Sequence, residues 1–208
     1  MNPSKIVGIG SNYRRHIEEM GRPVPTVPKV FLKPPSAVIG DGDAIQIPPG
    51  TDRVDHEAEL GIVIGRRMTR VSAADALGFV GGYTAVNDVT ARDFQRLDGV
   101  FSRAKGFDTF CPVGPRVVTS LDPSDLRIRC FVDGKLRQDG RTSDMIFDVP
   151  TILSFVSHIM TLEPGDLVAT GTPMGVGPIV PGQTVVVDVE GAGELRNPVV
   201  ARSDRVAR

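Results

Sequence analysis

Long apolar runs, cysteine pairs and blocks of like charge are all missing from this sequence of 208 residues. The longest apolar stretches, such as 60–64, fall far short of the roughly 20 residues that span a bilayer, and no signal-peptide apolar segment is found near the start. We therefore expect a cytoplasmic protein without a membrane partner. Lys and Arg total 24 against 25 Asp and Glu, with neither sign gathered into a long run. This balance argues against a nucleic-acid partner and favours a small ligand.

Cysteine occurs only twice, at Cys111 and Cys130. Their spacing forms neither a CxxC pair nor a disulfide framework. We expect both to be small, buried apolar residues.

Segments with helical periodicity are also few, which argues against a doubly wound α/β sheet. The 23 glycines and 17 prolines are scattered between short apolar runs, a pattern typical of a loop-rich fold dominated by strands. With 40% apolar residues, the chain can bury a core for one domain. We expect a single catalytic domain over residues 1–208, in which residues 1–35 form an N-terminal strand and a lid segment.

Strands are expected where short apolar runs are bounded by Gly, Pro or Asp. The expected strands cover residues 5–9, 31–35, 44–47, 60–64, 83–87, 116–118, 167–170, 184–189 and a last segment near Val199. Asp133-Gly134, between residues 127–132 and 135–138, predicts a hairpin with a type I′ turn. The expected helices cover residues 14–20, 73–77 and a segment from near Pro150 through Ile159.

The segment 14–28 has the composition of a lid. A short helix is followed by three prolines within residues 21–28, and these prolines favour an extended connection. We expect this segment to be mobile without ligand and ordered when a 2-oxo acid analogue is bound.

Three carboxylates occur at strand ends. Glu57 and Glu59 enter an apolar strand, where side chains two residues apart share a face. They repel each other and are costly to bury unless a cation or a shared proton relieves them. Asp88 follows the next strand, and three carboxylates without a cysteine or histidine cluster suit Mg²⁺ or Mn²⁺. The alternative is a solvated strand face with Asp88 as a helix cap, and spacing alone leaves both interpretations open.

Five sequence blocks, in one order from about residue 5 to residue 200, resemble the fumarylacetoacetate hydrolase superfamily. The blocks are the H-x-E-x-E-L segment His56-Glu57-Ala58-Glu59-Leu60, the segment Asn87-Asp88-Val89-Thr90-Ala91-Arg92-Asp93, the lysine segment Lys105-Gly106-Phe107, residues 134–147, and the loop Thr170-Gly171-Thr172-Pro173. Together they cover nearly the whole chain.

The resemblance implies a β-rich α+β fold, a mixed β-sandwich roll with a few short helices, usually found as a homodimer. It also implies roles for ten residues. Mg²⁺ or Mn²⁺ is held at Glu57, Glu59 and Asp88; His16 and Glu19 activate water from an N-terminal lid helix; Lys105 stabilises developing negative charge; Arg92, Gln95, Gly171 and Thr172 contact substrate.

The expected chemistry is cleavage of a carbon–carbon bond in a small 2-oxo acid. Such a substrate chelates the metal through its carboxylate and adjacent carbonyl, and the cation stabilises the enolate left by cleavage. For acylpyruvate hydrolysis, His16 removes a proton from water; for oxaloacetate decarboxylation, no attacking water is needed. The alternatives are an isomerase or decarboxylase of 2-hydroxy-dienoate diacids in aromatic catabolism, and a non-catalytic binding protein. The residues after Lys105 look more like bacterial isomerase and hydrolase relatives than the mitochondrial acylpyruvase, which leaves the substrate open.

A different catalytic class is suggested by Ser102-Arg103-Ala104-Lys105, which matches the S-x-x-K motif of Ser–Lys acyl enzymes. That class needs S-D-N and K-T-G partners. Neither occurs in the sequence.

Overall fold

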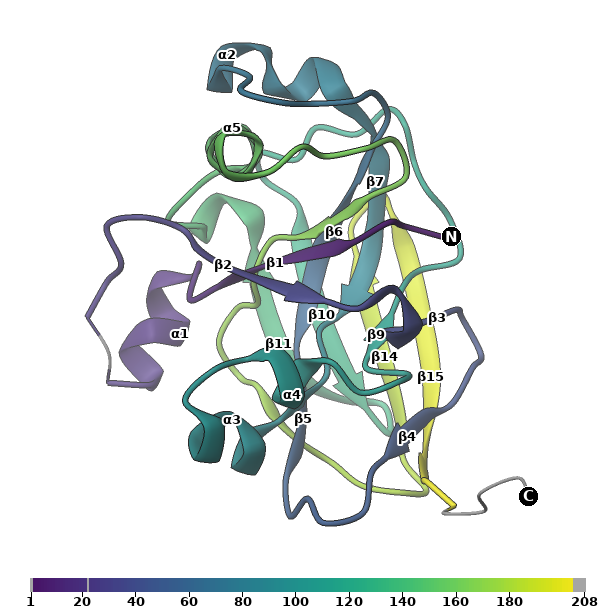
Figure 1. Ribbon diagram of the computed structural model, residues 1–208. Helices are drawn as coiled ribbons and strands as arrows, with labels where there is room; N and C mark the ends of the chain where they lie inside the picture. The colour runs from purple at the N-terminus through teal and green to yellow at the C-terminus, as the bar shows by residue number, and fades with distance from the viewer. Residues whose placement is uncertain (1, 22, 204–208) are drawn as a thin grey trace.

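Strands predominate over helices in the computed structural model, which describes residues 2–21 and 23–203 (Figure 1). The strands are β1 (Ile6–Gly10), β2 (Lys29–Lys33), β3 (Val38–Ile39), β4 (Ile45–Ile47), β5 (Val54–His56), β6 (Ala58–Ile64), β7 (Val80–Asn87), β8 (Thr90–Ala91), β9 (Cys111–Pro112), β10 (Arg127–Val132), β11 (Lys135–Arg141), β12 (Leu167–Ala169), β13 (Gly177–Ile179), β14 (Thr184–Val189) and β15 (Gly193–Ala201). The α-helices are α1 (Arg14–Glu19), α2 (Ala73–Ala76), α3 (Arg92–Asp98), α4 (Ser102–Lys105) and α5 (Val149–Ile159), and short 3₁₀ turns cover Pro35–Ala37, Leu77–Phe79 and Thr142–Asp144.

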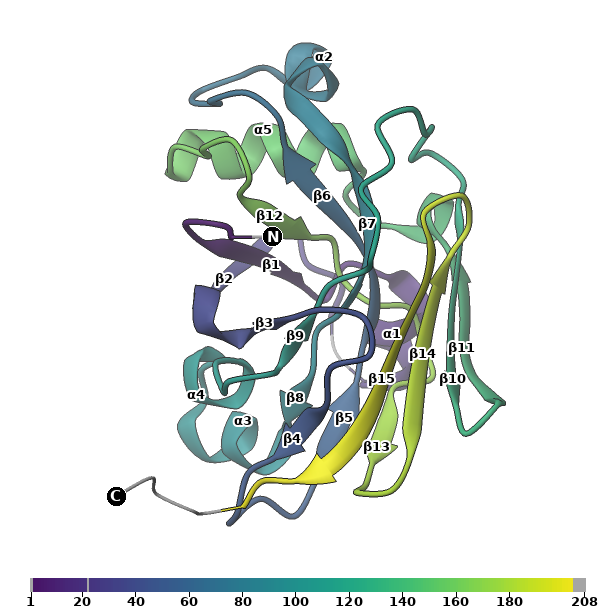
Figure 2. The same ribbon diagram turned by 90° about the vertical axis from the view of Figure 1, so that its right-hand side faces the viewer.

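Two five-stranded sheets form the body of the molecule (Figure 2). The first has the strand order β2-β1-β12-β6-β7 and the second β11-β10-β14-β15-β4. Both are mixed, because β1 pairs parallel with β12 and β15 parallel with β4 while their other strand pairs are antiparallel. Smaller sheets join β13-β5-β8 and β3-β9. The expected β-rich fold with few short helices is confirmed.

The main core lies between the two large sheets. Leu60 and Ile62 from β6 pack in the same apolar cluster as Ile128 from β10 and Val187 from β14. The clean alternation of β10 follows from this packing, because its even-numbered side chains are buried while its odd-numbered ones face outward. Burying each such aliphatic side chain stabilises the fold by about 1.5–3 kcal/mol.

The hairpin at β10 and β11 forms as its turn residues predict. Asp133 and Gly134 have φ of 50° and 73°, the positive values that a type I′ turn needs at both central positions. Helix α5 also begins as expected, since Pro150 lies in its first turn and Asp148 accepts a hydrogen bond of 2.9 Å from the Thr151 amide. Local turn and cap chemistry therefore determined both elements.

Some expectations about elements were wrong. Residues 116–118 do not form a strand, because Gly114 and Pro115 interrupt the segment that runs beside β7. Of the three residues, only Val118 bridges to β7, at Tyr83. Helices α3 and α4 and the short strands β3, β5, β8, β9 and β13 were not among the expected elements.

Both cysteines are buried as expected. Burial raises the pKa of each thiol to about 12, so neither is a reactive thiolate at neutral pH. Among the residues that the structure describes, no helix has the length and apolar character needed to cross a membrane.

Candidate active site

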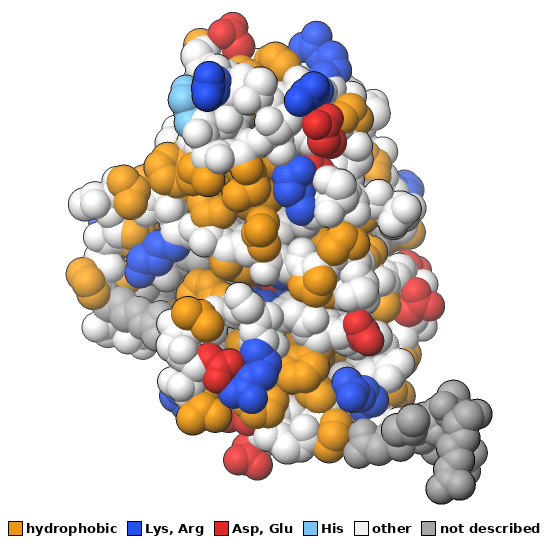
Figure 3. Space-filling view, in the orientation of Figure 1, with side chains coloured by type: hydrophobic (Ala, Val, Ile, Leu, Met, Phe, Trp, Pro, Cys, Tyr) orange, Lys and Arg blue, Asp and Glu red, His pale blue; other side chains and the backbone are white. Residues whose placement is uncertain are grey.

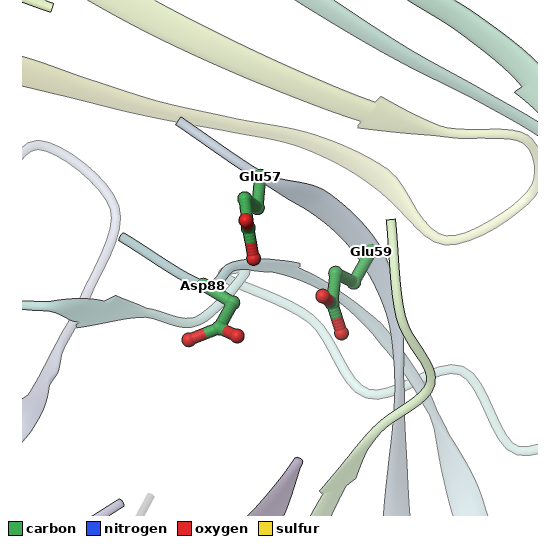
Figure 4. A group of neighbouring side chains, drawn as sticks. All are labelled: Glu57, Glu59 and Asp88. Atoms are coloured by element: carbon green, nitrogen blue, oxygen red, sulfur yellow. The ribbon is translucent and has the colours of Figure 1, made fainter. Parts of the chain in front are cut away.

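The side chains of Glu57, Glu59 and Asp88 converge at one end of the paired strands β6 and β7 (Figure 4). Each offers a carboxylate oxygen, and these oxygens lie within 4.8 Å of one another. The backbone fixes this arrangement, because the Asp88 amide donates to the Glu57 carbonyl at 2.8 Å and the Glu57 amide donates to Asn87 Oδ1 at 2.9 Å. Alternation along one strand and antiparallel pairing with the next thus bring the three carboxylates together.

Three cations surround this cluster. Lys105 Nζ donates to Glu57 Oε2 at 2.7 Å and also contacts Asp88 Oδ2. Arg92 donates through Nη2 to Glu57 Oε1. Lys33 Nζ lies 2.5 Å from Asp88 Oδ1. All six charged residues are at most 9% exposed, so the cluster is a buried ionic network.

The pKa values of Glu57 and Glu59 are shifted in opposite directions. Burial alone would raise the pKa of Glu57, yet the charges of Lys105 and Arg92 hold it below its usual range. Burial raises the pKa of Glu59 well above its ordinary value, and the negative charges of Asp88 and Glu57 raise it further. The surrounding protein therefore compensates the charge of Glu59 less well than that of Glu57.

The donor set fits a divalent cation. Three buried carboxylates with converging oxygens are the hard ligands that Mg²⁺ and Mn²⁺ prefer, and a second positive charge beside Glu59 would favour its ionised form. The Gly171 amide already donates to Glu59 Oε2 at 2.7 Å, which orients this carboxylate. Glu57, Glu59 and Asp88 are the residues that would hold the ion.

Helix α1 carries the expected dyad. His16 Nδ1 lies 3.5 Å from Glu19 Oε2, and the two residues share a helix face at a spacing of three. His16 is buried while the Glu19 side chain is 41% exposed. Burial lowers the pKa of His16, against the opposing charge of Glu57, so the imidazole is neutral at pH 7.

The preceding turn anchors this helix. Asn12 donates through Nδ2 to the Thr170 carbonyl at 2.8 Å and accepts from the Phe147 amide at 2.9 Å. Asn12 therefore ties the start of α1 to the loop that carries Gly171 and Thr172.

The carboxylates and the dyad histidine line one cavity. Nine of its lining residues are Ser11, His16, Met20, Phe31, Arg92, Gln95, Phe101, Lys105 and Thr172, besides the three carboxylates. Figure 3 shows a narrow hollow on this side of the molecule with hydrophobic side chains around it. Lys105 Nζ also lies 4.9 Å from the centre of the Phe31 ring, a distance at which a cation is attracted to the ring face.

Gly171 and Thr172 reach the site in different ways. The Gly171 amide is engaged with Glu59, whereas Thr172 lines the cavity. Thr172 Oγ1 donates to the Ala58 carbonyl at 2.9 Å and accepts from Gln138 Nε2 at 2.7 Å. Eight of the ten expected site residues thus line the cavity. Gly171 contacts Glu59, and Glu19 lies beside His16. The roles of all ten stay predictions.

Three residues of the site escaped the sequence reasoning. Lys33 offered no signal, because its partner Asp88 lies 55 residues away. Gln138, buried in β11, bonds through its amide to Ala58, His56, Thr172 and Pro173 and so joins the hairpin to the site. Asp55 could have been found, since it continues the alternation of Glu57 and Glu59 by two residues, and it accepts from Arg92 Nε at 2.8 Å.

The fold and site define a class: a β-rich enzyme framework around a buried carboxylate cluster with an adjoining histidine–glutamate pair. Residues 5–200 match the family model described as "Fumarylacetoacetate (FAA) hydrolase C-terminal". The chain belongs to this family.

Named relatives agree with this assignment. The chain is 42% identical over 194 residues to "Oxaloacetate decarboxylase, mitochondrial" of Dictyostelium discoideum, covering 90% of this chain and 89% of that protein. Its structure is similar to that of 2-hydroxyhepta-2,4-diene-1,7-dioate isomerase from Mycobacterium marinum, with a TM-score of 0.92, 49% identity, and coverage of 98% and 77%. It is also similar to fumarylpyruvate hydrolase from Pseudomonas aeruginosa in complex with Mn²⁺ and pyruvate, with a TM-score of 0.90, 32% identity, and coverage of 95% and 90%.

Proposed function

We propose that the protein cleaves a carbon–carbon bond in small 2-oxo acids with the help of Mg²⁺ or Mn²⁺, by oxaloacetate decarboxylation, acylpyruvate hydrolysis or both. The observation that carries the proposal is the convergence of Glu57, Glu59 and Asp88 in a cavity that also contains cationic side chains. When bound, the divalent ion would supply Lewis-acid stabilisation of an enolate. The Mn²⁺ and pyruvate named with the fumarylpyruvate hydrolase neighbour support this chemistry.

Arg92 and Lys105 would bind the substrate and stabilise its developing charge. Arg92, held by Asp55 and Gln95, presents a fixed guanidinium that suits a substrate carboxylate. Lys105 brings a second positive charge to the place where negative charge develops on the substrate. Its pKa is raised, because the charges of Asp88 and Glu57 outweigh the effect of burial, so it stays an ammonium at neutral pH.

His16 would act as the general base in hydrolysis. Its lowered pKa keeps the imidazole unprotonated at neutral pH, and Glu19 is placed to orient it. The base would take a proton from the water that attacks the carbonyl of the departing acyl group. Decarboxylation needs no such step, since carbon dioxide departs without an attacking nucleophile.

A panel of substrates tests the proposal. Protein loaded with Mn²⁺ is incubated with oxaloacetate, with acetylpyruvate and with a 2-hydroxy-dienoate diacid, each with and without excess EDTA. We expect turnover of oxaloacetate or acetylpyruvate that EDTA abolishes and Mn²⁺ restores. Undiminished turnover after exhaustive chelation would contradict metal dependence.

Isomerisation of 2-hydroxy-dienoate diacids is the second candidate function. The likeness to the Mycobacterium marinum isomerase favours it, and the same cavity offers groups that move protons without attack by water. Conversion of the dienoate in the panel above, without cleavage of either 2-oxo acid, would select this candidate.

We also propose that the chain forms a homodimer. The resemblance to the fumarylacetoacetate hydrolase family, whose members are usually homodimers, supports this proposal. Leu32 and Val100 are 48% and 58% exposed, so apolar side chains are available to such an interface. Light scattering across a range of concentrations should give twice the chain mass, and a monomer throughout would contradict the proposal. The cytoplasmic location stays a prediction, since the Dictyostelium relative is named as mitochondrial.

A further inference from the structure

A second hollow adjoins the catalytic cavity. It shares Met20, Arg92 and Gln95 with that cavity and continues outward past Arg53, Arg96 and Val176, with a volume of about 320 Å³. Because these three residues line both spaces, the two lie side by side, and we call the second one the outer groove.

Helix α3 links the two spaces. Arg92 at its first turn reaches the carboxylate cluster, and Arg96 lies four residues further along. Residues at this spacing share a helix face, and four residues advance the helix by about 6 Å. Arg96 is thus presented one turn outward from Arg92 on the same side of α3, and it lines the outer groove.

Two of the three cations that line the outer groove are held in ion pairs. Its walls carry three guanidinium groups, from Arg53, Arg92 and Arg96, against two carboxylates, from Glu19 and Asp55. Asp55 pairs with two of the cations: Arg53 Nε lies 2.8 Å from Asp55 Oδ1, and Arg92 Nε lies 2.8 Å from Asp55 Oδ2.

The third cation is available to a ligand. Arg96 is exposed and forms no ion pair within the described residues 2–21 and 23–203. A flexible guanidinium above a groove with Met20 and Val176 on its walls suits an aliphatic chain that ends in a carboxylate.

We propose that the outer groove is a subsite for the distal carboxylate of the substrate, with Arg96 as the residue that selects it. The inference rests on the proposed function and narrows it to one substrate class, the 2-oxo dicarboxylic acids, over 2-oxo acids with a neutral far end. The reactive 2-oxo acid end lies in the inner cavity, and the chain passes over Met20 to Arg96.

A pair of unreactive ligands of equal length tests the proposal. 2-Oxoadipate and 2-oxohexanoate share six carbons and the 2-oxo acid end, and differ only in whether the far end is a carboxylate or a methyl group. Their dissociation constants are measured by calorimetry on Mn²⁺-loaded wild type, Arg96→Gln and the control Arg116→Gln. Arg116 is also an exposed arginine, and it lies near Gly193 at the start of β15, away from both cavities.

The expected result is a preference of wild type and Arg116→Gln for 2-oxoadipate of roughly tenfold or more, as one charge-assisted contact provides. In Arg96→Gln the preference should fall to near unity, with the affinity for 2-oxohexanoate unchanged. Equal binding of the two ligands by wild type, or an unchanged preference in Arg96→Gln, would overturn the subsite and leave the proposed function standing. Failure of both ligands to bind in the presence of Mn²⁺ would overturn both.

Discussion

Lys33 and Asp88 form an ion pair in the interior of the protein, with Lys33 Nζ 2.5 Å from Asp88 Oδ1 and neither side chain more than 1% exposed. Removing one member of a buried pair leaves the other charge uncompensated and costs about 3–5 kcal/mol. We expect Lys33→Met to lower the free energy of unfolding by about 3 kcal/mol, the lower end of this range, because Lys105 still contacts Asp88. Urea denaturation without added metal measures the difference.

The control for this variant is Lys29→Met. Lys29 lies on the same strand, β2, and is exposed, so its replacement should change stability by less than about 0.5 kcal/mol. Equal effects of the two substitutions would show that the Lys33 ion pair does not stabilise the fold.

Gly171→Ala should weaken metal binding through Glu59. Gly171 has a φ of 97°, and a Cβ there would lie 2.8 Å from Asn12 Cβ and 3.0 Å from the Ile9 carbonyl. The loop must shift, which would break the bond from the Gly171 amide to Glu59. Partners that orient a ligand are worth roughly 10- to 100-fold in affinity, and we expect a loss of that size for Mn²⁺ by calorimetry.

Gly182→Ala is the matched control. Gly182 has a similar φ of 94°, but a Cβ there meets nothing within 4 Å. It should therefore share the backbone strain and keep full Mn²⁺ affinity. A comparable loss of affinity in both variants would show that backbone strain, and not the lost hydrogen bond to Glu59, weakens Mn²⁺ binding.

The hydrolysis of acylpyruvate should persist at acidic pH. A general base must be unprotonated, and burial holds the pKa of His16 below the ordinary 6.5. The acid limb of the kcat profile should therefore fall below pH 6.5. The limb should be missing from oxaloacetate decarboxylation by the same protein over the pH range in which hydrolysis declines, since this reaction does not need the base.

His16→Ala should separate the two reactions. Loss of a general base typically lowers the rate by roughly 10² to 10⁴, and we expect this loss for acylpyruvate hydrolysis with a smaller loss for decarboxylation. Both rates are measured on one preparation that still binds Mn²⁺. Equal losses would mean that His16 positions substrate or closes the lid.

Asp166→Asn should loosen the N-terminal strand. The buried Asp166 carboxylate accepts hydrogen bonds from the Ser4 amide at 3.0 Å and the Glu163 amide at 2.8 Å, and pairs with Lys5 Nζ at 2.5 Å. Losing a charged acceptor costs about 1.5–3 kcal/mol. Glu163→Gln, which removes only an exposed pair with Arg67 at 3.4 Å, should cost less than about 1 kcal/mol.

The difference in unfolding free energy between wild type and Asp166→Asn should become smaller in acid. Burial opposes ionisation of Asp166, but the contacts from Lys5 and the Glu163 amide hold its pKa below the ordinary value of 3.8. A carboxyl group whose pKa is lower in the folded protein than in the unfolded chain stabilises the fold fully at pH values above the unfolded-state pKa. This stabilisation is lost as the pH falls through the folded-state pKa. The gap between wild type and Asp166→Asn should therefore be constant from pH 5 to 7 and shrink below about pH 4. A gap that widens in acid would contradict the assignment.

Features set by neighbouring residues were predictable from the sequence. Asp133-Gly134 predicted the hairpin because only a few residues tolerate positive φ at both turn positions. The carboxylates Glu57 and Glu59 were found because strand alternation places them on one face.

Features set by distant partners were not predictable in this way. The pairing of Lys33 with Asp88 and the bonds of Gln138 to the Thr172 loop depend on how separate strands come together. Helices α3 and α4 are 7 and 4 residues long, too short for helical periodicity to stand out from the sequence. Residues 116–118 have the composition of a strand, but only Val118 bridges to β7.

The central claim is that Glu57, Glu59 and Asp88 bind one divalent cation. It is tested most directly by titrating Mn²⁺ into wild type, Glu59→Gln and the exposed control Glu194→Gln, with free Mn²⁺ followed by electron paramagnetic resonance. The account predicts one site per chain in wild type and in Glu194→Gln, and an affinity at least roughly 100-fold weaker in Glu59→Gln. Equal affinities in all three proteins, or no stoichiometric site in wild type, would contradict it.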